Sequence, residues 1–143
     1  MTSQQRRLPL WFGRSSYRSL WFLVFAAVLF LCLFALHVPA IAGELASYGI
    51  PVGFGVDLVI LFALMLIPAA LNAYLNDGLL ISIALAASPL FGVVLGSMLY
   101  TSPLSQLNYT TLFHTTLPFM AIAIGLAAGL GFVLGSGARR LRA

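Results

Sequence analysis

Asp57 is the side chain in this sequence whose type and position most directly suggest chemistry. It lies at the start of an apolar stretch, and an ionisable group inside a membrane span is costly and often marks an ion site or a proton relay. The preceding Gly53, Phe54 and Gly55 favour a second interpretation, in which Asp57 caps the next helix by accepting hydrogen bonds from free backbone amides. The sequence leaves both interpretations open.

A polar stripe with a proline accompanies Asp57 on the same apolar stretch. At about 100° per residue, Asp57, Pro68 and Asn72 lie within about 60° of one another around a helix. Together with Pro89 in the next stretch, these residues could line a polar core or a transport path, since proline removes a backbone hydrogen bond and invites a kink. The structural alternative is that membrane helices tolerate proline and that Asn72 makes a hydrogen bond between helices.

Two histidines and two carboxylates could gather at one membrane face. His37, Glu44, Asp57 and His114 all map to the outer ends of apolar stretches, and such a group could bind a metal or sense pH. No two of them are spaced as a ligand pair on one helix, so the sequence predicts no metal site.

Enzymatic chemistry is not expected. The Ser and Thr residues occur without a general base at helical spacing, so the sequence predicts no catalytic residue and no cofactor. The single cysteine, Cys32, has no partner for an internal disulfide, and we expect it to be a small buried hydrophobe.

Positive charge is confined to the two ends of the chain. No Lys or Arg occurs between Arg18 and Arg139. The chain is 62% hydrophobic and 7% charged, whereas a typical soluble domain is about 25% charged. This pattern indicates a chain that crosses a bilayer. The net charge of +4 comes from arginines that flank apolar stretches, so we expect anionic lipid headgroups as a partner and no nucleic acid.

Four apolar stretches are long enough to cross a bilayer, at about residues 20–42, 56–75, 79–99 and 116–135. We therefore predict an all-α, polytopic integral membrane protein with four transmembrane helices in an antiparallel bundle, formed by residues 20–136. Residues 1–19 would be a cytoplasmic segment in the membrane interface, and residues 137–143 a cytoplasmic Arg-rich tail.

An even number of spans places both chain ends on the same side of the membrane. All the arginines precede the first span or follow the fourth, so the positive-inside rule predicts cytoplasmic ends in the cell membrane. Amphipathic rings prefer the headgroup level, and every Trp and Tyr falls near a predicted interface. These are Trp11, Tyr17, Trp21 and Tyr74 on the cytoplasmic side, and Tyr48, Tyr100 and Tyr109 on the outer side.

A secretory signal peptide is the alternative interpretation of the first span. An arginine-bearing start, an apolar stretch and Ala40, Ile41 and Ala42 resemble a signal peptide with an A-x-A cleavage site. Cleavage there would leave three spans and an N-terminus outside the cell, and the mass of the purified protein distinguishes the two cases.

The turn between the second and third spans is Asn76, Asp77 and Gly78. We expect Gly78 to take the left-handed conformation that commonly ends a helix. The connection is so short that the two spans would form a tight antiparallel hairpin.

Small residues at four-residue spacing predict where the helices pack. Lipid tails are as apolar as leucine, so membrane helices associate through close backbone approach and hydrogen bonds. The third span carries Ala84, Ser88, Gly92 and Gly96, and the fourth carries Ala121, Gly125 and Gly129, followed by Gly131 and Gly135. We predict that these stripes pack the third and fourth spans against each other or against a second copy.

These patterns favour a non-enzymatic membrane subunit, either an accessory protein or one that forms oligomers. Its partner would be a second copy or another membrane protein. The alternative is a small transporter or channel component that uses Asp57, Asn72 and the kinks at Pro68 and Pro89.

Overall fold

The computed structural model describes residues 11–38, 47, 58–101 and 112–142. Within them the chain is helical and contains no strand. The elements are α2 (Ser16–His37), α4 (Leu58–Asn76), α5 (Leu79–Thr101), the short π-helical turn η2 (Leu112–Thr116) and α7 (Leu117–Arg140). In these ranges, four helices are long and apolar enough to cross a membrane.

The helices begin and end where local sequence signals favour it. Ser15 precedes α2 with an extended backbone, and its side chain accepts a hydrogen bond from the backbone N–H of Arg18. Pro118 occupies the first turn of α7, where its missing N–H costs nothing. Helix α7 continues to Arg140, past the predicted end of the fourth span at residue 135.

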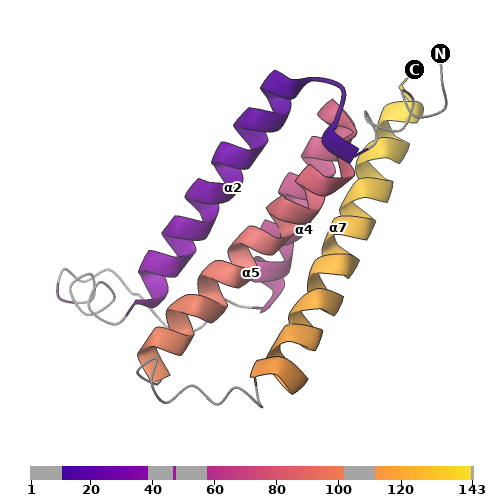
Figure 1. Cartoon of the computed structure of the whole chain (residues 1–143). Coiled ribbons are helices and arrows are strands. Elements are labelled where there is room, and N and C mark those ends of the chain that lie inside the picture. The colour runs from indigo at the N-terminus through magenta and orange to yellow at the C-terminus, as the bar shows by residue number, and fades with distance from the viewer. Residues whose placement is uncertain (1–10, 39–46, 48–57, 102–111, 143) are drawn as a thin grey trace.

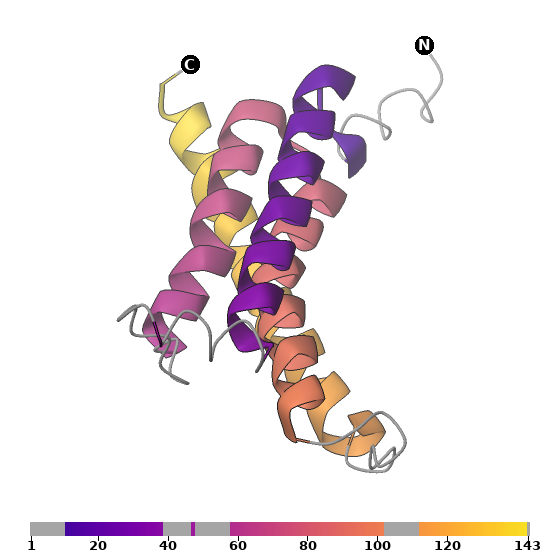
Figure 2. The same cartoon turned by 90° about the vertical axis from the view of Figure 1, so that its left-hand side faces the viewer.

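Helix α5 lies at the centre of the arrangement (Figures 1 and 2). It packs against α2, α4 and α7, while α4 also packs along α7 and barely meets α2. The main apolar core lies among α4, α5 and α7 and consists of Leu61, Met65, Ala69, Ala86, Leu90, Met120, Ala127 and Ala128. A smaller cluster of Ala26, Ile81 and Leu85 joins α2 to α5.

Cys32 is exposed on α2, so the expectation of a buried hydrophobe is wrong. Helix α2 packs closely on α5 alone, and most of its surface therefore faces away from the rest of the protein. Pro68 and Pro89 are both buried, and α4 and α5 remain continuous helices through them.

The small-residue stripe of α5 packs against α2. A Cβ atom added at Gly92 would lie 2.7 Å from the carbonyl oxygen of Phe30, and one at Gly96 would lie 2.9 Å from that of Phe34. Gly92 and Gly96 therefore pack on the first span, and the prediction that they face the fourth span or a second copy is wrong. The physical reason is helical geometry, because Gly92 lies about 160° around α5 from the core residue Leu90.

The glycines of α7 divide into two sets. Gly131 and Gly135 lie against α4, where an added Cβ at Gly131 would be 3.0 Å from the carbonyl oxygen of Leu66. Gly125 and Gly129 have open space instead, since nothing lies within 4 Å of an added Cβ at either position.

The turn between α4 and α5 differs from the predicted one in which residue is left-handed. Asp77, and not Gly78, has a positive φ of 61°, and Asp tolerates this conformation better than most residues. The missing side chain of Gly78 instead lets another backbone segment approach the turn closely. A Cβ atom at this position would lie 3.1 Å from the backbone of Phe12 and Gly13.

Candidate functional site

Most of the buried polar side chains in the described part of the chain gather at one end of the helices. Here α2 and α5 begin and α4 and α7 end (Figure 1). Ser19, Asn72, Asn76 and Ser82 are all buried at this end. We call these four residues, together with Asp77 and its arginine partners, the polar end cluster.

Asn76 connects the end of α4 to the start of α2. Its side-chain oxygen accepts a hydrogen bond from the backbone N–H of Ser15 at 3.0 Å, and its side-chain nitrogen donates to the hydroxyl of Ser19 at 2.8 Å. Its backbone carbonyl accepts from the N–H of Arg14 at 2.7 Å. A side chain at Gly13, whose φ is 92°, would overlap the amide group of Asn76.

Asn72 connects α4 to α5. Its side-chain nitrogen donates to the carbonyl oxygen of Gly78 at 2.7 Å and to the hydroxyl of Ser82 at 2.9 Å. The Ser82 hydroxyl donates in turn towards the carbonyl oxygens of Ala69 and Gly78, each at 3.1 Å. Asn72 is fully buried and makes an interhelical hydrogen bond.

Asp77 joins the two ends of the sequence. Its carboxylate forms ion pairs with Arg14, at 3.2 Å, and with Arg139 at the end of α7. The Asp77 side chain is 15% exposed, and the Arg139 side chain 24% exposed. Turn chemistry alone identifies Asp77 only as a turn residue. A signal for its ion pairs is nevertheless present in the sequence, because Asp77 is the one acid predicted to lie on the same side as the arginines.

Two further arginines hold the same end of the protein together. Arg18 donates a hydrogen bond from Nη1 to the carbonyl oxygen of Leu75 at 2.8 Å. Arg142 donates to the hydroxyl of Tyr74 at 3.1 Å, and its guanidinium lies 5.9 Å from the centre of that ring. These two arginines therefore bind groups of the protein itself.

The contacts of the polar end cluster join helices to one another. Its serine hydroxyls donate to backbone carbonyls, and its carboxylate is held by two guanidinium groups. Neither a histidine nor a cysteine takes part in it. Across the described ranges, no group of three or more His, Cys, Asp or Glu side chains could hold a metal ion.

The other predicted polar residues do not meet this cluster. Asp57 and Glu44 lie outside the described residues, so the four-residue group at the outer side is untested. His37 lies near the end of α2, where its Nδ1 is 2.8 Å from the carbonyl oxygen of Leu33, and His114 is exposed in η2.

Away from the polar end cluster, the described interior is apolar. Ser88 is the remaining buried polar side chain there, and its hydroxyl donates to the carbonyl oxygen of Leu85 in its own helix. Pro68 is buried and lines an apolar groove between α2 and α4, and Pro89 is buried within α5.

Comparison of this chain with protein-family models, with curated proteins and with solved structures gives no match.

Proposed function

We propose that this protein is a non-enzymatic membrane subunit that assembles with a second copy of itself through the outer face of α7. In this proposal the helices form an antiparallel bundle that crosses the cell membrane four times, with both chain ends in the cytoplasm. The confinement of arginine to the two chain ends supports this orientation.

The observation that carries the proposal is the open space beside Gly125 and Gly129. The other stripe glycines, Gly92, Gly96 and the pair formed by Gly131 and Gly135, all meet the backbone or side chains of a neighbouring helix closely. Gly125 and Gly129 meet nothing within 4 Å, although they have the same four-residue spacing.

Glycine within a helix needs compensation. It lowers the stability of the helix by roughly 0.5–1 kcal/mol relative to alanine, because a glycine loses more conformational freedom when the chain folds. Gly131 and Gly135 are compensated by the close approach of α4. Gly125 and Gly129 receive no such compensation within one copy, which favours a helix from outside the monomer as their neighbour.

The geometry of this face suits contact between identical copies. Ala121, Gly125 and Gly129 are exposed and fall within about 80° around α7. Ile122 and Leu126 border them and are 64% and 56% exposed. A shallow track of small residues beside larger ones is self-complementary, because each copy's larger side chains can lie in the other's track.

The association state of the purified protein tests the proposal. In a mild detergent and after reconstitution, we expect the native protein to be a dimer, measured by analytical ultracentrifugation and by single-molecule photobleaching in bilayers. The double variant Gly125→Leu, Gly129→Leu should be a monomer with unchanged helix content, because added side chains hold the backbones apart.

Gly137→Leu is the matched control for this variant. Gly137 also lies on α7 with nothing within 4 Å of an added Cβ, but it is displaced around the helix from the stripe. Gly137→Leu should remain dimeric. A native protein that is monomeric in both media, or a double variant that stays dimeric, contradicts the proposal.

A further inference from the structure

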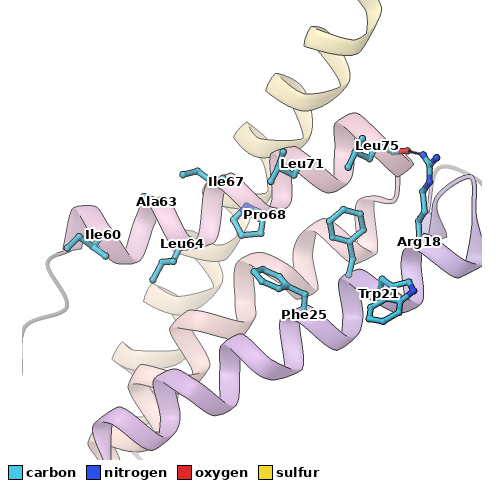
Figure 3. A pocket seen from close by; sticks show the side chains of 11 residues that line it. Arg18, Trp21, Phe25, Ile60, Ala63, Leu64, Ile67, Pro68, Leu71 and Leu75 are labelled. Carbon is cyan, nitrogen blue, oxygen red and sulfur yellow. Dashed lines mark hydrogen bonds between the residues drawn. The ribbon is translucent and has the colours of Figure 1, made fainter. Parts of the chain in front are cut away.

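Helices α2 and α4 leave an apolar groove between them, which we call the α2–α4 groove (Figure 3). Its volume is about 890 Å³. The α2 wall carries aromatic rings, including Trp21, Phe22 and Phe25, and the α4 wall carries aliphatic side chains, including Ile67 and Leu71. Arg18 is the charged side chain that lines it.

The groove exists because α2 packs on α5 and not on α4. The two walls are joined at one end by the hydrogen bond from Arg18 to the carbonyl oxygen of Leu75, 2.8 Å long, as the dashed line in Figure 3 shows. The groove therefore has a polar end, beside the polar end cluster, and an apolar length that is open to the side.

Among the described residues, no carboxylate neutralises the positive charge at the polar end of the groove. No ion pair joins Arg18 to an acidic side chain in the described ranges, because Asp77 is engaged by Arg14 and Arg139. Arg18 is exposed and uses Nη1 for Leu75, so its planar fork keeps further donors suited to phosphate oxygens. Trp21 is 58% exposed, and its ring nitrogen lies towards the Arg18 end (Figure 3).

The length and lining of the groove suit an extended hydrocarbon chain. Its α4 wall runs from Ile60 to Leu75, which is about 22 Å along the helix axis. Apart from Arg18 at one end, the side chains that line it are aliphatic or aromatic.

We propose that the α2–α4 groove is a binding site for an anionic phospholipid. An acyl chain lies between the aromatic wall of α2 and the aliphatic wall of α4, and the phosphate lies on Arg18. The positive charge of Arg18 at one end of the groove matches the phosphate of such a lipid. The apolar lining along the rest of the groove matches its acyl chain. This site lies on other elements than the α7 face proposed for self-association, and neither proposal depends on the other.

Lipid retention during delipidation tests the site. The protein is reconstituted with equimolar phosphatidylglycerol and phosphatidylcholine of identical acyl chains, then washed with detergent, and the bound lipid is measured by native mass spectrometry. We expect selective retention of phosphatidylglycerol. Arg18→Gln should reduce it roughly fivefold or more, from the loss of one interfacial cation, whereas Arg18→Lys should keep most of the preference for the anionic lipid.

Arg140→Gln is the matched charge control. Arg140 is exposed at the same end but does not line the groove, so its replacement should leave retention unchanged. An equal loss in Arg18→Gln and Arg140→Gln would show diffuse surface attraction and overturn the site, as would unchanged retention in Arg18→Gln.

Variants that fill the groove test the acyl-chain part of the site separately from the headgroup part. Ala63→Trp, or the milder Ile67→Trp, places a ring in the groove and should abolish selective retention, while Ala27→Trp on an exposed, non-lining part of α2 should not. Inorganic phosphate alone should not displace the lipid. Full displacement by phosphate, retention in both filled variants, or a changed oligomeric state in place of lost lipid would each overturn the proposal.

Discussion

The side-chain nitrogen of Asn76 donates a hydrogen bond to the hydroxyl of Ser19, at 2.8 Å and across 57 residues of sequence. It joins the end of α4 to the first turns of α2, two helices that hardly pack against each other. A polar pair of this kind is worth most where water is excluded, because an unpaired amide there is costly. The polar end cluster thus holds together helices that apolar packing leaves apart.

Asn76→Ala should lower the free energy of unfolding by about 1–3 kcal/mol, because it removes the bonds to Ser15 and Ser19 and leaves the backbone N–H of Ser15 without its acceptor. Denaturation in detergent, followed by circular dichroism, measures the change. Ser136→Ala, on an exposed hydroxyl of α7, is the control and should be nearly neutral. Equal stability of the two variants would mean that the Asn76 bonds contribute nothing.

Asp77→Asn isolates the charge of Asp77 from its backbone conformation. Asn accepts the positive φ of 61° as readily as Asp does, so the variant loses only the ion pairs with Arg14 and Arg139. We expect a loss of about 0.5–1 kcal/mol at low salt that shrinks as salt is added, since these side chains are partly exposed.

Asp77→Ala should cost roughly 1–2 kcal/mol more than Asp77→Asn, because alanine adds the strain of the left-handed conformation. Thermal unfolding at low and high salt compares the two variants. If Asp77→Asn and Asp77→Ala unfold at the same temperature, the positive φ carries no cost in this turn.

Gly92→Ala and Gly125→Ala should change stability in opposite directions. The added methyl group at Gly92 would lie 2.7 Å from the carbonyl oxygen of Phe30, so α2 must shift, at a cost of about 1–3 kcal/mol. At Gly125 the methyl group meets nothing within one copy, and helix propensity predicts a gain of roughly 0.5–1 kcal/mol in detergent that holds the monomer. Urea titration of both variants measures the difference, and loss of stability in both would contradict the open face of α7.

Labelling of single cysteines in intact cells tests the proposed orientation. In a Cys32→Ser background, Ser3→Cys and Ala143→Cys should be protected from a membrane-impermeant maleimide, whereas Ser105→Cys should react. Opposite reactivity of Ser3→Cys and Ala143→Cys would rule out an even number of spans. Reaction of both terminal cysteines from outside would reverse the orientation.

The contacts that α2 makes with the other helices favour a first span that is not cleaved. Cleavage after Ala42 would remove α2 and with it Ser19, which bonds to Asn76. It would also uncover Gly92 and Gly96, which lie against the α2 backbone. The mass of the purified protein therefore reports whether these contacts exist in the cell.

Part of the polar end cluster could be anticipated from the sequence, and part could not. The residue type of Asn72 predicts an interhelical bond as one of its two possible roles, since an amide in an apolar helix needs a partner. From sequence alone, Asn76 and Asp77 indicate only a turn, because the residue types that favour turns also make hydrogen bonds and ion pairs between distant segments. Their partners Ser19, Arg14 and Arg139 lie far away in sequence, and no local pattern points to them.

The sequence alone determined the four apolar helices and the end at which the arginines gather, because both follow from composition along the chain. Only the tertiary structure decided that Gly92 meets α2, that Gly131 meets α4 and that Gly125 meets nothing. The physical reason is that lipid tails are as apolar as the side chains they touch, so hydrophobicity identifies a span without identifying its neighbour. Neighbours are selected by close backbone approach and by hydrogen bonds such as that between Asn76 and Ser19, and these depend on which faces meet in space.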